Sequence, residues 1–193
     1  MSLLPAFEIG IWNAWIFMIW LLIQNFGVRL VSKDLYRRVG QPPDMKPSQT
    51  YKTISYLSMP LWLLSTAYSI FLPLQLGTIW FHIGLIIFLV GLIINTVATI
   101  SFATTPMNRP VTTGVYHYSR HPIYAALVLI YLSVGIASAS WVFLLVAIML
   151  AALVNFSVTD EERYCLEKYG DAYRDYMNRT PRWIGIPKIV KLK

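Results

Sequence analysis

The fold of this chain is decided by residues 123–159, which read IYAALVLIYLSVGIASASWVFLLVAIMLAALVNFSVT. The stretch has no charged residue and forms two apolar runs, 123–139 and 141–159. Each run is close to the roughly 20 residues that a transmembrane helix needs. Only Ser138-Ala139-Ser140 lies where the runs meet, and so short a connection makes consecutive helices antiparallel neighbours. The stretch therefore predicts a hairpin of two transmembrane helices.

Three further apolar stretches precede this hairpin. They cover residues 9–31, 54–76 and 79–103, and the turn Leu76-Gly77-Thr78 joins the last two. Of the 193 residues, 56% are hydrophobic and 13% are charged, whereas a soluble domain carries about 25% charged residues. We therefore expect an all-α fold: one domain over residues 1–193, an integral membrane bundle of five transmembrane helices with an amphipathic C-terminal helical tail at 160–193.

Several classes of site are excluded by the residues that are present. A single cysteine, Cys165, cannot form an intramolecular disulfide. No pair of His, Cys or carboxylate residues has metal-ligand spacing within a span, so we expect no metal site. No glycine-rich loop follows a strand, which excludes a Rossmann nucleotide site. The net charge is +7, but no basic stripe carries interleaved aromatic residues, so we expect no nucleic-acid partner.

The basic residues predict the orientation in the membrane. All 16 Lys and Arg lie in three segments: six around the connection after the first span, two after the third and eight after the fifth. The positive-inside rule then puts the N-terminus outside and the C-terminus in the cytoplasm. We expect a multi-pass protein of a bacterial or archaeal inner membrane, with an endoplasmic reticulum membrane as the alternative. Membrane lipids with anionic headgroups are expected partners of the basic segments.

A few polar residues lie within or near the apolar runs. An unpaired amide in hydrocarbon is costly, so hydrogen bonds between helices are the first expectation for them. Two of them, Asn95 and Asn155, could instead line a substrate cavity, and His82 is expected to be an interfacial anchor. The set is Asn13, Gln24, Asn25, His82, Asn95 and Asn155.

A first candidate cluster precedes the fourth apolar run, at residues 114–124, which read GVYHYSRHPIY. Pro122 suits the first turn of a helix, where its missing N–H costs nothing. Arg120 and His121 then stand beside free backbone donors and the positive end of the helix dipole, where a carboxylate or phosphate is stabilised. The alternative is that Arg120 anchors the helix at the headgroups and the tyrosines form an aromatic belt.

A second candidate cluster, Asp160-Glu161-Glu162, follows the fifth run, and the hairpin brings it to the side of Arg120 and His121. These carboxylates could accept hydrogen bonds from ribose hydroxyls or an ammonium group. The alternative is a solvated helix end with ion pairs to Arg120 or Arg163. Beyond it, Gly170 is expected to interrupt the helix and a second short helix to run from Asp171 to Arg179. Apolar positions of this tail recur at helical spacing, so it is expected to lie on the membrane face or over the bundle.

Both clusters resemble the signatures of one superfamily. The pattern Gly114-x-Tyr116-x-x-x-Arg120-His121-Pro122-x-Tyr124 resembles that of the isoprenylcysteine carboxyl methyltransferases and phospholipid methyltransferases, and so does Glu161-Glu162 followed by Gly170-x-x-Tyr173-x-x-Tyr176. The resemblance implies an integral-membrane enzyme that uses S-adenosylmethionine without a Rossmann domain. Its cofactor would enter from the cytosol, and a lipid-like acceptor would reach the site between helices.

The resemblance also implies roles for single residues. Arg120 and Glu162 are the candidate catalytic residues; either could help to keep the acceptor nucleophile unprotonated, and the sequence does not decide between them. No metal is implied. The residues implied to bind the cofactor are Gly114, Tyr116, Arg120, His121, Pro122, Tyr124, Glu161 and Glu162. The chain has Asn108 and Ser157 where the carboxyl methyltransferases usually have His and Arg. A lipid amine is therefore at least as suitable an acceptor as a carboxylate.

Two other functions remain open. Membrane sterol reductases, which bind NADPH and reduce a sterol or enone double bond, have a C-terminal region similar to Lys168-Tyr169-Gly170 after the acidic pair. They generally have Asn where this chain has Ile123. A non-enzymatic membrane scaffold with a basic tail is the second alternative, and it would tolerate substitution of Arg120, His121 and Glu162.

Overall fold

The computed structural model describes residues 8–31 and 45–188 of the chain. In these ranges the chain is helical and holds no β-strand beyond an isolated bridge between Asn13 and Pro73. The α-helices are α1 (Trp15–Val31), α3 (Gln49–Tyr68), α4 (Ile79–Thr104), α5 (Pro122–Ala137), α6 (Trp141–Tyr169) and α7 (Asp171–Arg179). Two 3-10 turns, η1 (Ser69–Phe71) and η2 (Gly114–His117), stand between them. The all-α prediction is confirmed for the described residues.

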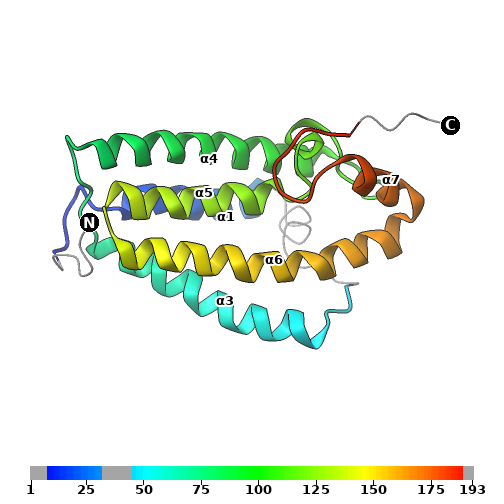
Figure 1. The fold of residues 1–193 in the computed structure, drawn as a ribbon, viewed down its shortest axis with the longest axis horizontal. Helices are drawn as coiled ribbons and strands as arrows, with labels where there is room; N and C mark the ends of the chain where they lie inside the picture. The colour runs from blue at the N-terminus through cyan, green and yellow to red at the C-terminus, as the bar shows by residue number, and fades with distance from the viewer. Residues whose placement is uncertain (1–7, 32–44, 189–193) are drawn as a thin grey trace.

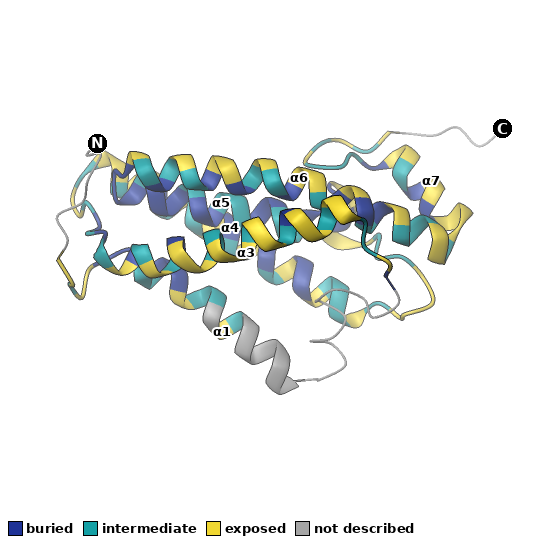
Figure 2. Cartoon of the chain, turned by 90° about the horizontal axis from the view of Figure 1, so that it is seen from below, coloured by how far each residue is buried: buried dark blue, intermediate teal, exposed yellow. Residues whose placement is uncertain are grey.

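The hairpin of α5 and α6 forms the centre of the bundle. In Figure 1, α5 lies between α4 and α6, with α1 behind it, and α3 runs beside α6 and diverges towards its own N-terminus. Burial is greatest along α5, as the dark stretch in Figure 2 shows. Its side chains Ala126, Ile130 and Val134 have no exposed surface. The predicted antiparallel hairpin is confirmed, with Ser140 accepting a hydrogen bond from the N–H of Phe143 at the start of α6.

Small residues allow α4 to approach α5 closely. A Cβ atom at Gly84 would lie 2.6 Å from the Cβ of Ala137, a distance that real side chains do not adopt. Only glycine therefore permits the observed separation of the two backbones at this point. Close approach through small residues is a common way for helices to associate in a membrane, where the hydrophobic effect between helices is lost.

Membrane-spanning character is confirmed, whereas the predicted number of five spans is confirmed only in part. Three helical stretches of the described chain are long and apolar enough to cross a bilayer: Gln49–Phe71, Ile79–Thr104 and Trp141–Tyr169. The helix Pro122–Ala137 is apolar but shorter. It reaches about 24 Å at 1.5 Å per residue, a little less than the roughly 30 Å hydrocarbon core.

Two predicted spans differ at their ends. The first was expected from residue 9 but α1 begins at Trp15, and the second was expected over 54–76 but α3 begins at Gln49. The N–H of Ala14 donates to the carbonyl of Leu72, and the N–H of Leu74 donates to that of Trp12. These bonds pair residues 12–14 with residues 72–74 in an extended conformation, and Pro73 cannot supply a helical N–H. The helices therefore do not continue through these residues. At its other end, α3 gains a turn because the Ser48 side chain accepts from the N–H of Tyr51.

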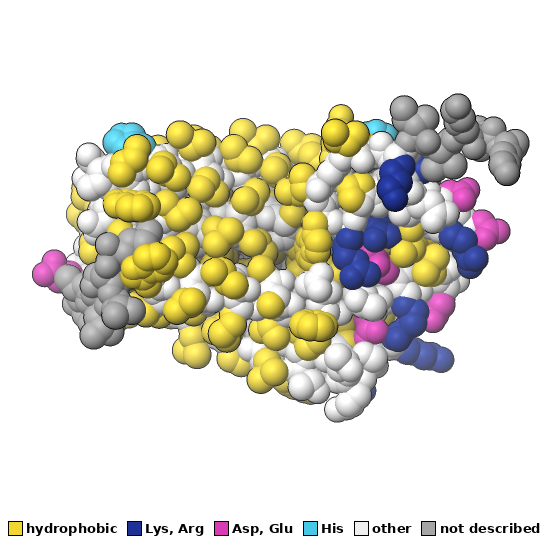
Figure 3. Space-filling view, in the orientation of Figure 1, with side chains coloured by type: hydrophobic (Ala, Val, Ile, Leu, Met, Phe, Trp, Pro, Cys, Tyr) yellow, Lys and Arg dark blue, Asp and Glu magenta, His cyan; other side chains and the backbone are white. Residues whose placement is uncertain are grey.

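Charged side chains gather at one end of the bundle, which we call the charged end. Figure 3 shows them at the right of the molecule, past an almost wholly apolar flank. Helix α6 reaches this end because it continues to Tyr169, about 15 Å beyond the predicted limit of the span at residue 159. The Lys and Arg side chains of the described residues are thus segregated as a single orientation requires. That this end faces the cytoplasm stays a prediction.

Candidate functional site

The loop before α5 is shaped by contacts that aim Arg120 and His121 at α6. Gly114 has a φ of +62°, a left-handed conformation that glycine adopts easily, and lies against Ser101 of α4. The N–H of His121 donates to the hydroxyl of Ser119, and the N–H of Arg120 donates to the carbonyl of Pro181. Pro122 then begins α5, as predicted. The two functional side chains therefore leave a loop that is fixed on both sides.

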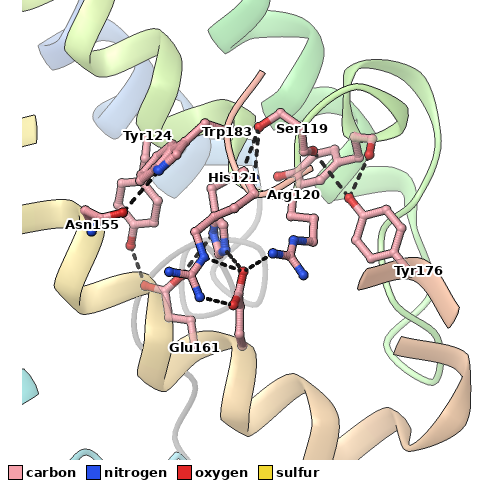
Figure 4. Close-up of polar contacts among 11 residues, drawn as sticks. Ser119, Arg120, His121, Tyr124, Asn155, Glu161, Tyr176 and Trp183 are labelled. Carbon is pink, nitrogen blue, oxygen red and sulfur yellow. Dashed lines mark hydrogen bonds and ion pairs between the residues drawn. The ribbon is translucent and has the colours of Figure 1, made fainter. Parts of the chain in front are cut away.

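Glu162 is the centre of the site, and its side chain is only 4% exposed. Its Oε1 lies 3.2 Å from Nη2 of Arg120 and 3.1 Å from Nε2 of His121. Arg182 pairs with both carboxylate oxygens, Nε with Oε1 at 3.2 Å and Nη2 with Oε2 at 2.6 Å (Figure 4). Such two-point pairs are stronger and better oriented than single contacts. One carboxylate thus joins the loop before α5, the helix α6 and the segment after α7.

Glu161 is bound much less fully than its neighbour. The hydroxyl of Tyr124 donates to its Oε1, and Nδ1 of His121 lies 3.9 Å from its Oε2. Figure 4 shows Tyr124 in direct contact with Glu161 and the ring of His121 beside this pair. The imidazole therefore lies between the two carboxylates, with one nitrogen towards each. Glu161 keeps hydrogen-bonding capacity that Glu162 has already used.

The segment 180–188, which we call the C-terminal strap, crosses the site. The indole N–H of Trp183 donates to Oδ1 of Asn155 over 3.1 Å, and its ring centroid lies 6.2 Å from that of His121. The N–H of Gly185 donates to the carbonyl of Tyr118, and Ser119 donates its hydroxyl to the carbonyl of Arg182. The strap is thereby fixed to the loop before α5. It brings a cation and an aromatic ring to the acidic pair.

Helix α7 lies over the end of the bundle, the second of the two positions that the sequence left open. The hydroxyl of Tyr176 donates to the carbonyl of Tyr116 over 2.7 Å and to that of Ser119 over 3.3 Å. Burial raises the pKa of Tyr176 and of Tyr173 well above the usual value. Both phenols therefore stay protonated as hydrogen-bond donors at neutral pH. Through Tyr176, α7 supports the loop that carries Arg120.

The third acid of the predicted cluster has a different role. Asp160 accepts hydrogen bonds from the N–H and the hydroxyl of Ser48 and pairs with Arg163 at 2.9 Å. The ion pairs of the expected alternative are present, Asp160 with Arg163 and Glu162 with Arg120, but both acids are buried and not solvated. Asp160 ties the start of α3 to α6. It does not reach the cluster around Glu162.

The predicted site residues divide into two groups. The structure brings together Arg120, His121, Tyr124, Glu161 and Glu162. Gly114, Tyr116 and Pro122 shape the loop and the helix start, and Tyr116 is buried beneath α7. The two positions that depart from the carboxyl methyltransferases stay apart from the cluster: Asn108 is exposed, and Ser157 donates to the carbonyl of Leu153 in its own helix.

Sequence reasoning missed Arg182 and Trp183. The eight basic residues of the tail were interpreted together as a topology signal, so none of them was singled out. The signal that could have found these two is their order after the last helix, with Pro181 ending α7 and a cation and an indole following directly. That signal is short, and only the folded chain shows that Arg182 reaches Glu162.

The polar residues of the apolar runs have varied partners. Gln24 donates to the hydroxyl of Thr99 between α1 and α4, as predicted. Asn13 bonds instead to the carbonyls of Glu8 and Ile70. His82, expected as an interfacial anchor, is exposed and bonds to the carbonyl of Thr78 at the start of α4. The side chain of Asn25 lies outside the described residues. Asn95 is buried, and neither of its amide atoms has a partner in the described part of the chain.

The donor set at the charged end fits S-adenosylmethionine. Nε of Arg120 is buried and has no hydrogen-bond partner among residues 8–31 and 45–188, although Nη2 of the same group pairs with Glu162. That unused donor suits the carboxylate of the cofactor's amino-acid part. Glu161 can accept from an ammonium group or a ribose hydroxyl, and Trp183 offers a ring to a base or a cation. No group of three potential metal ligands occurs among these residues.

Comparison with known proteins gives two similarities. A family model described as "Protein of unknown function (DUF1295)" matches residues 4–180. The Protein-S-isoprenylcysteine O-methyltransferase of Schizosaccharomyces pombe is 34% identical to the chain over 80 residues, which are 41% of this chain and 33% of the yeast protein. The chain therefore matches about a third of the length of that curated relative.

Proposed function

The chain belongs to the DUF1295 family, and we propose that it is an integral-membrane methyltransferase that uses S-adenosylmethionine. The acceptor we propose is a lipid-like or amphipathic molecule that carries an amine or a carboxylate. The observation that carries this proposal is the set of contacts at Glu162, where Arg120, His121 and Arg182 meet from distant parts of the chain. The name of the yeast relative supports the reaction class.

The residues would share the work of binding. Arg120 would hold a carboxylate through its unused Nε, and Glu161 would accept from an ammonium group or a hydroxyl. Glu162 would orient both arginines and His121, because its oxygens already accept from all three. S-adenosylmethionine supplies a methyl group that its sulfonium has already activated. The protein therefore needs mainly to align the acceptor with that methyl group.

Proton removal is the second task when the acceptor is an amine, because a protonated amine has no lone pair to attack with. Glu161 is better suited to this than Glu162, since among the described residues Tyr124 is its one hydrogen-bond partner and its second oxygen keeps free capacity. Arg120 would hold the cofactor and would touch the reacting molecules. We therefore propose Glu161 as the proton acceptor, Arg120 as a binding residue and Glu162 as a positioning residue.

We further propose that the charged end faces the cytoplasm and that the membrane is a bacterial or archaeal inner membrane. A soluble cofactor would then reach Arg120 from the cytosol, while the acceptor would approach from the bilayer between helices. The distribution of Lys and Arg supports this orientation.

A binding titration tests the proposal and its two alternatives. Purified protein in detergent is titrated with S-adenosylhomocysteine and, in parallel, with NADPH. We expect saturable binding of S-adenosylhomocysteine alone, and its loss in Glu162→Ala. The matched control is Glu167→Ala, an exposed acid on the same helix, which should bind as the wild type does.

Other results would contradict the proposal. Binding of NADPH alone would identify a reductase. Binding of neither compound to a folded sample would favour a scaffold. Unchanged affinity for S-adenosylhomocysteine in folded Glu162→Ala would remove the cluster from the cofactor site.

A further inference from the structure

Two side chains, one on α1 and one on α4, have buried polar atoms that lack hydrogen-bond partners in the described part of the chain. They are Trp20, through its indole Nε1, and Asn95, through both atoms of its amide. Asn95 is only 1% exposed. Buried polar atoms nearly always have a hydrogen-bond partner, in the protein or in a bound molecule, and leaving them without one in an apolar surrounding is costly. These three atoms are therefore candidates for hydrogen bonds to a polar group of a ligand.

Contacts on either side of these residues place them at one level of the bundle. The rings of Phe17 and Phe88 stack with centroids 4.3 Å apart, and seven residues beyond Phe17, Gln24 donates to Thr99 over 2.6 Å. These two side-chain contacts place residues 17–24 of α1 at the level of residues 88–99 of α4. Trp20 lies one turn before Gln24 and shares a face of α1 with it. Asn95 likewise lies one turn before Thr99 and shares a face of α4 with it.

We call Trp20, Gln24, Asn95 and Thr99 the inner polar site. Its depth follows from the packing of α4 on α5, which are antiparallel. The backbone of Gly91 lies against Ala126 and Ile130, so Asn95, one turn further along α4, is level with the first turns of α5. His121 directly precedes α5. At 1.5 Å per residue, the inner polar site is about 7 Å further into the bundle than His121.

The chemistry of the four side chains restricts the ligand. None of them is charged, and a charged ligand group at this depth would be unpaired and costly. The indole of Trp20 only donates, whereas the amide of Asn95 both donates and accepts. A hydroxyl satisfies both kinds of atom, because its oxygen accepts and its hydrogen donates.

We propose that the inner polar site binds a neutral hydroxyl group of an amphipathic ligand whose other polar end lies at the cluster around Glu162. That this ligand is the methyl acceptor rests on the proposed function, but the binding site itself does not. Because the two sites are offset by about 7 Å along the bundle, the acceptor would then carry a hydroxyl at least about 7 Å from its reacting group.

The experiment compares two probes that differ only in a hydroxyl, radiolabelled 1-hexadecanol and hexadecane, bound to the full chain in detergent. We expect the wild type to bind hexadecanol about five- to tenfold more tightly than hexadecane, the difference that one or two net hydrogen bonds give. Asn95→Leu should bind both probes alike. It should still fold, because the change removes an unsatisfied amide from an apolar site.

Two further variants sharpen the comparison. Trp20→Phe should reduce the preference for hexadecanol, since it removes one donor and keeps most of the ring. Thr96→Val is the matched control on α4, because the Thr96 hydroxyl already donates to the carbonyl of Leu92. It should leave the preference unchanged.

The outcomes separate this inference from the proposed function. Equal binding of both probes to the wild type would overturn the inference. A preference for hexadecanol that persists in Asn95→Leu would also overturn it, because the unpartnered atoms of Trp20 and Asn95 would then bind no more than an internal water. Binding of S-adenosylhomocysteine is measured on the same samples. A preference for hexadecanol that Asn95→Leu abolishes, in a protein that does not bind S-adenosylhomocysteine, would confirm the site and contradict the methyltransferase.

Discussion

Arg182 shows how one side chain can complete a site from far along the chain. It meets Glu162 through two parallel contacts, and its side chain is 33% exposed. It stands beside Arg120, so the carboxylate between them offsets the repulsion of two cations. A guanidinium can form this two-point pair, whereas the ammonium of a lysine is a point charge and cannot.

We expect Arg182→Lys to weaken the binding of S-adenosylhomocysteine about tenfold, although the net charge is unchanged. The loss follows from the missing second hydrogen bond, which leaves Glu162 freer to turn. Arg179→Lys is the control, since Arg179 is exposed and bonds to a backbone carbonyl of its own helix. Calorimetric titration of the three proteins measures the difference, and equal affinities would show that the strap acts only as a cover.

A second residue-scale prediction separates binding from chemistry. With a lipid amine as acceptor, Glu161→Gln should bind S-adenosylhomocysteine within about threefold of the wild type. Its methyl transfer should fall at least about 100-fold, because a general base contributes roughly that much or more. Transfer of a labelled methyl group into a total lipid extract measures the rate. An unchanged rate would exclude Glu161 as the proton acceptor, and Glu167→Gln controls for the loss of one charge.

Sequence reasoning found the half of the site that short motifs encode. Arg120 and His121 precede a proline that begins a helix, and Glu161 and Glu162 follow an apolar run, so local order predicts where they emerge. Arg182 belongs to no such pattern. Its role depends on the path of the strap, which is set by long-range bonds such as that from Arg120 N–H to the carbonyl of Pro181.

At the scale of the elements, the start of α3 is tied to the end of α6. Ser48 caps α3 through its hydroxyl oxygen and donates its own proton to Asp160, so one side chain serves both helices. The apolar pattern alone placed this helix start later, at residue 54. An N-cap can be predicted from the residues just before a helix. Here the acid that binds the capping Ser48 lies more than a hundred residues further along the chain, so the sequence does not reveal the pairing.

We expect Ser48→Ala to lower the free energy of unfolding by about 1–2 kcal/mol, the usual effect of losing an N-cap. The side chain of Asp160 would keep its pair with Arg163, so the protein should still fold. Thr53→Ala on the same helix is the control, because the Thr53 hydroxyl bonds only to its own turn. Thermal unfolding of the wild type, Ser48→Ala and Thr53→Ala is compared in one detergent. Equal unfolding midpoints for Ser48→Ala and the wild type would contradict a stabilising link between α3 and α6.

The turns and the hairpin were predictable for the opposite reason. The short connections Leu76-Gly77-Thr78 and Ser138-Ala139-Ser140 interrupt long apolar runs. Their small and polar residues mark the ends of the apolar helices in the sequence itself. The extended pairing of residues 12–14 with 72–74 leaves Pro73 as its one mark in the sequence. Residues 12–14 are apolar enough to continue a helix, and their pairing with 72–74 in the folded chain prevents it.

At the scale of the whole molecule, the segregation of charge predicts one orientation. In a Cys165→Ser background, we expect Leu76→Cys to react with a membrane-impermeant maleimide added to intact cells. Asp171→Cys should react only after the membrane is opened. Leu76 lies in the short turn at the apolar end, and Asp171 is 96% exposed at the charged end. The reverse pattern of labelling would invert the proposed topology.

The position of the strap along the chain also fixes an order of events during synthesis. Glu162 leaves the ribosome 20 residues ahead of Arg182, which at about 5–20 residues per second is a delay of about 1–4 s. All of α1 to α6 has been translated by then. The acidic pair is therefore synthesised before the arginine that pairs with Glu162, and the proposed cofactor site can be complete only when translation has passed α7.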